Sequence, residues 1–151
     1  MTKYDDASWH YGGAFPDDLR PEAASTHIGI FLAWCVLHDL AEEETLEDLG
    51  EDLDLLYQRK MTPGAFLREL FDEKFSSDDL SSLGNAFAVA YYVGKNDDAL
   101  YVDDYLDLFN VQANDIYSVP DTWETFDKLS PIILERYRSW ELSDMPRFLN
   151  P

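Results

Sequence analysis

Hydrophobic residues recur along most of this chain at intervals of three and four, which is the period of an amphipathic helix. The clearest stripe is formed by Leu46, Leu49, Leu53 and Leu56. Further stripes with this period cover residues 62–75, 76–94, 97–109 and 121–141. The stripes of residues 62–75, 76–94 and 121–141 begin at residue types that cap helices. No run alternates as a strand would, so the pattern predicts an all-α, single-domain bundle of five to six helices.

The segment from about Pro21 to Leu40 departs from the amphipathic pattern because it is apolar on most sides. It contains no Asp, Glu, Lys or Arg between Glu22 and Asp39. A helix of this kind is normally buried among other elements. We therefore expect it to be the central helix, with Gly29 allowing a neighbouring element to approach closely.

Several local signals predict where helices begin or bend. Thr45 with Asp48, and Asp121 with Glu124, match the spacing of a capping pattern. Ser130-Pro131 predicts a kink or a restart in the last helix, because proline removes a backbone donor and clashes with the preceding turn.

The two ends of the chain lack the helical period. Residues 1–21 combine four aromatic side chains with glycines and prolines, which predicts an ordered arm with room for a short strand. Residues 142–151 end in prolines and are expected to form a loop. The predicted organisation of the single domain of residues 1–151 is an arm (1–21), helices (22–141) and a tail (142–151).

Charge is the most unusual property of the sequence. The chain has 31 acidic and 11 basic residues and a net charge of −20, yet 46% of its residues are hydrophobic, enough for a folded core. This charge repels nucleic acid and anionic membrane surfaces. A basic protein partner gains from complementary potential, although the acids could also serve only for solubility.

The acids gather on two predicted helical faces. Eight of the thirteen residues from Glu42 to Asp54 are acidic, and the segment from Asp97 to Asp107 repeats the pattern. As a hypothesis, these segments form a docking surface for a basic protein, and a solvated surface is the alternative. The candidate partner-binding residues are Glu43, Glu47, Asp48, Glu51, Asp52, Asp54, Asp103, Asp104 and Asp107.

The three histidines do not match a known metal pattern. His27 and His38 are separated by roughly 16 Å along one helix, so they cannot share an ion. His10 could approach only one of them, and the chain has no paired cysteines. We therefore expect no metal or other cofactor. The interpretation is instead that His10 and His27 hydrogen-bond between the arm and the central helix.

The single cysteine and the apolar segments bear on the compartment. Cys35 lies one helical turn from His38, but a thiol within an apolar helix is more often an inert core residue. One cysteine suits a reducing compartment. The longest uncharged apolar run, Ile28 to Leu37, is shorter than the ~20 residues of a membrane span, and no secretion signal is visible. A cytoplasmic location is expected.

The N-terminal block resembles a known group of proteins. Y-D-D-A-S-W-H-Y-G-G at Tyr4–Gly13, F-P at Phe15–Pro16, T-H-I-G at Thr26–Gly29 and A-W at Ala33–Trp34 resemble a family of small uncharacterised bacterial cytoplasmic proteins. Its members look like the acidic immunity proteins that accompany toxins of interbacterial competition. The resemblance implies a protein that neutralises a toxin by direct contact, with a structural motif at Trp9, His10, His27 and Trp34.

The sequence thus favours a binding protein with no catalytic residues. One alternative is a small enzyme that uses His10 and His27 with a carboxylate such as Asp5 or Asp6. Another is an acidic regulator that mimics the charge of nucleic acid.

Overall fold

The protein is described by a computed structural model that covers residues 1–150, apart from the side chain of Asp97. That side chain, which opens the predicted second acidic segment, and Pro151, the last residue of the predicted tail, lie outside the described residues. The elements in chain order are β1 (Lys3–Asp6), α1 (Ala7–Tyr11), η1 (Pro21–Ser25), α2 (Thr26–Leu37), α3 (Glu43–Leu49), η2 (Gly50–Asp52), α4 (Leu53–Tyr57), α5 (Pro63–Leu70), β2 (Lys74–Ser76), η3 (Ser77–Asp79), α6 (Ser82–Phe87), η4 (Ala88–Val93), η5 (Lys95–Asp97), α7 (Leu100–Phe109), η6 (Ala113–Ser118) and α8 (Trp123–Leu142).

The predominance of helix is confirmed, but the prediction of an all-α fold of five to six helices is wrong in detail. Among residues 1–150 there are eight α-helices and a small antiparallel sheet of β1 and β2. Asp5 pairs with Phe75 and Asp6 with Lys74 in that sheet. Phe75, predicted on the helical stripe of residues 62–75, is instead a buried strand residue.

The extra helices have local causes. The stripe from Leu46 to Leu56 predicts one helix, but Gly50 adopts φ +55° and separates α3 from α4. A positive φ is readily adopted by glycine, so the break occurs where the sequence permits it. The five-residue helix α1 forms within the predicted arm.

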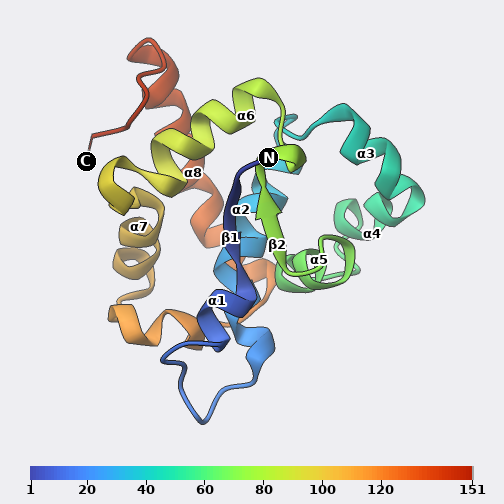
Figure 1. The fold of residues 1–151 in the computed structure, drawn as a ribbon, viewed down its shortest axis with the longest axis vertical. Helices are drawn as coiled ribbons and strands as arrows, with labels where there is room; N and C mark the ends of the chain where they lie inside the picture. The colour runs from blue at the N-terminus through green and yellow to red at the C-terminus, as the bar shows by residue number, and fades with distance from the viewer. Residues whose placement is uncertain (151) are drawn as a thin grey trace.

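The central position of α2 is confirmed. Figure 1 shows α2 in the middle of the molecule with β1 running across it. Every residue from Thr26 to Val36 is buried. The close approach predicted at Gly29 is also confirmed, because a Cβ at this position would overlap the carbonyl oxygen of Pro63 and lie 3.0 Å from Gly64 Cα. Gly29 therefore lets the start of α5 pack directly on α2.

Two of the predicted helix starts are displaced. The α3 helix begins at Glu43 with Glu42 as its cap, so the Thr45 capping prediction is wrong; Thr45 Oγ1 donates to Asp78 O at 3.0 Å. The cap of α8 is Thr122 rather than Asp121. The Asp121 carboxylate instead accepts from Gly64 N at 2.9 Å.

The last helix is not interrupted by its proline. The α8 helix runs through Pro131 as one element of 20 residues, contrary to the predicted restart. Trp140 of α8 is buried and its ring centroid lies 5.4 Å from that of Phe87, at the end of α6. Packing of this kind offsets the backbone hydrogen bond that proline removes.

None of the helices among the described residues combines the length and the apolar character that crossing a membrane requires.

Candidate functional site: a carboxylate between two imidazoles

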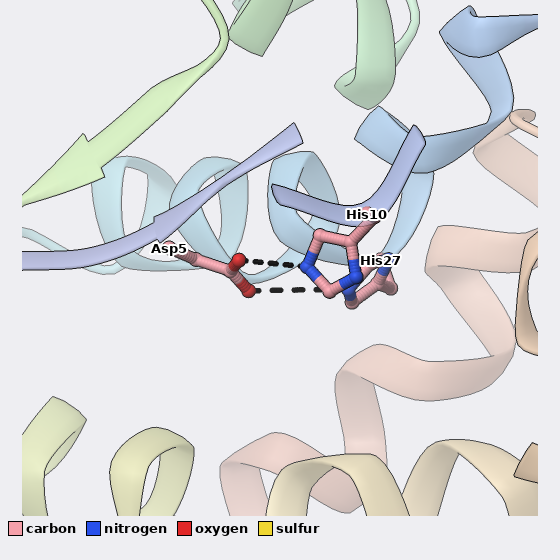
Figure 2. A group of neighbouring side chains, drawn as sticks. All are labelled: Asp5, His10 and His27. Carbon is pink, nitrogen blue, oxygen red and sulfur yellow. Dashed lines mark hydrogen bonds and ion pairs between the residues drawn. The ribbon is translucent and has the colours of Figure 1, made fainter. Parts of the chain in front are cut away.

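Three polar side chains from three different elements meet between the N-terminal arm and the central helix α2. Asp5 comes from β1, His10 from α1 and His27 from the first turn of α2. Figure 2 shows the Asp5 carboxylate facing both imidazole rings. His10 Nε2 lies 2.7 Å from Asp5 Oδ1, and His27 Nε2 lies 3.9 Å from Asp5 Oδ2. We call these three residues the Asp-His-His cluster.

Local structure explains how β1 and α1 bring Asp5 and His10 together. Asp6 caps α1, because its Oδ1 accepts from Ser8 N at 2.9 Å. This cap starts a helix immediately after the strand, so His10 on α1 folds back over Asp5. The antiparallel pairing of Asp5 with Phe75 fixes the strand beneath it.

Tyrosines surround the cluster. Tyr92 OH donates to Asp5 Oδ2 at 2.6 Å, and Tyr117 OH lies 2.7 Å from His10 Nδ1. Tyr101 OH donates to the main-chain oxygen of His27 at 2.5 Å. The first two contacts tie the arm to η4 and η6, and the third ties α2 to α7, so the cluster joins segments that are distant in sequence.

Burial and hydrogen bonding set the ionisation of the cluster. Burial lowers the pKa of His27 to about 4, more than the nearby Asp5 carboxylate raises it. Burial would raise the pKa of Asp5, but the hydrogen bond from His10 and the two imidazoles outweigh it, so this pKa lies below its usual value. At neutral pH the cluster therefore presents an ionised carboxylate beside a neutral His27 ring.

The predicted contact between His10 and His27 forms in a different way. Their rings meet edge to face with centroids 4.8 Å apart, and the structure shows no hydrogen bond between them within residues 1–150. Asp5 connects them instead. The sequence suggested Asp5 only as one nearby carboxylate, and nothing in the periodicity singled out Tyr92 or Tyr117.

The two tryptophans of the predicted structural motif have opposite environments. Trp34 is fully buried and stacks on His38 at 4.1 Å, whereas Trp9 is 55% exposed. Lys3 Nζ lies 5.1 Å from the centre of the Trp9 ring, so this side chain packs on the surface beside the arm. Cys35 is fully buried, and burial raises the pKa of its thiol, which disfavours the reactive thiolate.

The acidic candidates divide into an exposed set and one paired residue. Asp103 and Asp107 are exposed on α7. Asp104 instead accepts two hydrogen bonds from Arg136, at 2.8 and 2.9 Å, and one from Tyr91 OH at 2.6 Å. We name six exposed acids on α3, η2 and α4 the acidic face; they are the predicted candidates Glu43, Glu47, Asp48, Glu51, Asp52 and Asp54.

The pairing of Asp104 predicts a structural role. Asp104→Asn should lower the free energy of unfolding by about 1–2 kcal/mol, because it weakens charge-assisted hydrogen bonds that hold α7 to α8. Asp107→Asn, on the same helix but exposed, should change it by less than about 0.5 kcal/mol. Urea unfolding of both variants measures the difference; equal effects would contradict this assignment.

Two grooves border the acidic face. One, of about 580 Å³, lies between α3, the end of α5 and β2. The other, of about 560 Å³, lies between α3, η3 and α6. Thr45 and Asp48 contribute to both grooves. The second is lined by the carboxylates of Glu42, Glu44, Asp48 and Asp78, and no Lys or Arg is among the described residues around it.

A family model described as a domain of unknown function, DUF7832, matches residues 3–119. The chain belongs to this family. The DUF7832 match extends well beyond the N-terminal block that suggested the resemblance, and it contains the Asp-His-His cluster, Tyr92, Tyr117 and the acidic face. No curated protein and no solved structure matches the chain.

Proposed function

We propose that this protein binds a basic partner protein through the acidic face, and that the partner is a bacterial toxin which it neutralises by direct contact. The observation that carries the proposal is that the six acids of the acidic face are exposed and unpaired among residues 1–150. None of them forms an ion pair with a residue in the described part of the chain.

Unpaired acids on short helices destabilise the free protein. Like charges one turn apart, such as Glu43 and Glu47 on α3, weaken a helix by about 0.2–0.5 kcal/mol per pair. A cationic partner would remove that repulsion, so binding would recover stability that the free protein lacks. The groove bordered by Glu42, Glu44 and Asp78 offers a place for a Lys or Arg side chain of the partner.

An apolar anchor lies beside the charges. Tyr57 at the end of α4 is 51% exposed. Tyrosine is common at the centre of protein interfaces, where its ring buries a large area and its hydroxyl can bond. Steering by the acids and anchoring by Tyr57 together describe an interface that needs no covalent chemistry.

Charge reversal tests the proposal. An immunity protein is expected to have its toxin encoded beside its own gene. The variant E47K/D48K/E51K/D52K should lower the association rate with such a toxin domain by about 10-fold or more, because steering becomes repulsion. It should also abolish protection of cells that express the toxin. Surface plasmon resonance at two salt concentrations measures the first effect.

The matched control is D17K/D18K/E135K/E141K, which reverses four exposed acids outside the acidic face. Each reversal changes the charge by two units, so both variants change the net charge from −20 to −12. If the two variants bind alike, net charge alone matters and the acidic face is not the docking site.

The Asp-His-His cluster favours one alternative, a small enzyme that uses His10 and His27. In that case His27→Ala would remove an activity while the protein stays folded, and the protein would not protect cells that express a toxin. An acidic mimic of nucleic acid would instead compete with DNA for a basic protein, with strong dependence on salt.

A further inference from the structure

We propose that Asp5, His10 and His27 form a binding site for one divalent transition-metal ion of the Zn²⁺ class. Each residue offers one ligand atom, and these atoms lie within 4.8 Å of one another. Two imidazoles and one carboxylate are a ligand set that such ions accept, with water in the remaining position. The inference is independent of the proposed docking function.

The distances around Asp5 fit an ion placed between the three side chains. Metal–ligand bonds of about 2.0–2.2 Å at tetrahedral angles place two ligand atoms about 3.3–3.5 Å apart. The contacts of Asp5 with His10 (2.7 Å) and His27 (3.9 Å) lie on either side of this separation. The His10 distance is to Oδ1 and the His27 distance is to Oδ2, and the three ligand atoms lie within 4.8 Å of one another. Shifts of the side chains by about 1 Å would bring all three to bonding distance.

The surroundings of His10 are suited to a metal ligand. A coordinating histidine usually donates its second ring N–H to a neighbouring oxygen, which fixes the ring. Tyr117 OH is 2.7 Å from His10 Nδ1 and can accept a hydrogen bond from an Nδ1–H group, since a phenol either donates or accepts a hydrogen bond. Without metal, Tyr117 donates to Nδ1 and His10 Nε2–H donates to Asp5; with metal, His10 Nδ1–H donates to Tyr117.

The Asp5 carboxylate is also held by a hydrogen bond from a tyrosine. Tyr92 OH donates to Asp5 Oδ2, which orients the carboxylate toward the two rings. Hydrogen-bonded carboxylate ligands are typical of metal sites, because the second bond limits their rotation.

His27 is left without a close partner inside the protein. Its Nε2 is 3.9 Å from Asp5, beyond hydrogen-bond distance, and its buried Nδ1 contacts no donor or acceptor among the described residues. A buried imidazole with no hydrogen bond is unfavourable by about 1–3 kcal/mol. Coordination through Nε2 would give that nitrogen a strong interaction, while Nδ1 would carry the ring proton in its buried position.

Solvent can reach the site from one side. The side chain of His10 is 26% exposed and that of Asp5 is 13% exposed, whereas that of His27 is 3% exposed. An ion can therefore enter past His10, and its open coordination position would face the same side.

The spacing of the histidines and the cysteine, taken without the carboxylates, predicts no metal site. It correctly places His10 near a single histidine, but the third ligand is a carboxylate five residues before His10. The position of this carboxylate beside the rings depends on how β1 and α1 fold back on each other, which the sequence alone does not show.

Titration of the metal-free protein with ZnCl₂, followed by isothermal calorimetry, tests the inference. We expect one ion per chain, and His10→Gln should raise the dissociation constant by more than about 100-fold, because loss of even an outer-shell partner typically lowers affinity about 10- to 100-fold. His10 is partly exposed, so this variant should remain folded. With Co²⁺, the visible absorption of a low-coordinate ion should appear in the wild type and be lost in His10→Gln.

Two control variants separate the site from nonspecific binding by acids and histidines. His38→Gln removes the histidine that stacks on Trp34, outside the cluster, and should bind the ion as the wild type does. E47K/D48K/E51K/D52K should do the same. No ion bound, or binding that His10→Gln leaves unchanged, would overturn the metal site while leaving toxin binding unaffected.

Discussion

Replacing Gly29 with alanine is expected to lower the free energy of unfolding by about 2–3 kcal/mol. The new Cβ would overlap Pro63 O and lie 2.7 Å from Pro63 C and 3.0 Å from Gly64 Cα. These are backbone atoms at the start of α5, so no side chain can rotate away. The gain in helix propensity, about 1 kcal/mol, offsets only part of the strain.

Chemical denaturation of Gly29→Ala and of Gly13→Ala measures this effect against a matched control. A Cβ at Gly13 would meet atoms no closer than 3.5 Å, and Gly13 does not have a positive φ, so its substitution should change stability by less than about 0.5 kcal/mol. A Gly29 variant as stable as the control would mean that α2 and α5 can separate without loss of packing.

The sequence predicted the buried centre of the fold because the signal there is carried by many residues at once. Eleven consecutive residues of α2 are buried, and their lack of charge is visible without any knowledge of their neighbours. The Thr62 cap of α5 was also predictable, since its Oγ1 accepts from Ala65 N three residues later. Such signals depend only on neighbouring residues, so they allow helices and helix starts to be predicted from a single sequence.

The sheet was not predictable in the same way. β1 has the sequence K-Y-D-D and β2 the sequence K-F-S, neither long enough to show alternation. Their pairing joins residues about 70 positions apart, so the strands exist because tertiary contacts place them together. The Asp-His-His cluster depends on this pairing, and for that reason it could be named from the sequence only as a loose possibility.

The acidic candidates show where periodicity is insufficient. Asp103, Asp104 and Asp107 look alike on a helical wheel. In the structure, however, Arg136 and Tyr91 donate hydrogen bonds to Asp104 alone among the three. Which member of a charged face is paired depends on the side chains that a neighbouring helix presents. The six residues of the acidic face lack such neighbours, and this absence within residues 1–150 makes them the better docking candidate.

Acidification of the metal-free protein from pH 7 to pH 5 is expected to remove about 2 kcal/mol of stability through His27 alone. The pKa of His27 is about 4 in the folded protein, against an ordinary value of 6.5. Between these values the unfolded chain binds more protons, so the free energy of unfolding falls as the pH falls. Above pH 6.5 the contribution is fully present.

The slope must be measured as a difference, because other groups titrate nearby. Burial raises the pKa of Asp79 to about 6, which acts in the opposite direction over the same range. The lowered pKa of Asp5 acts in the same direction as His27, but below its ordinary value of 3.8. Urea unfolding at pH 7 and pH 5, with a chelator present, should therefore give a smaller loss for His27→Gln than for the wild type, by about 2 kcal/mol.

His27→Gln is itself expected to be less stable at every pH, because it replaces a buried ring. That offset cancels when each variant is compared with itself at the two pH values. If His27→Gln and the wild type lose the same stability, folding leaves the pKa of His27 at its ordinary value, and the predicted lowering is wrong. If the wild type loses less stability than His27→Gln, the buried imidazole is already charged at neutral pH. The ion pair with Asp5 would then outweigh burial, and the cluster would present a charged His27 to any ligand.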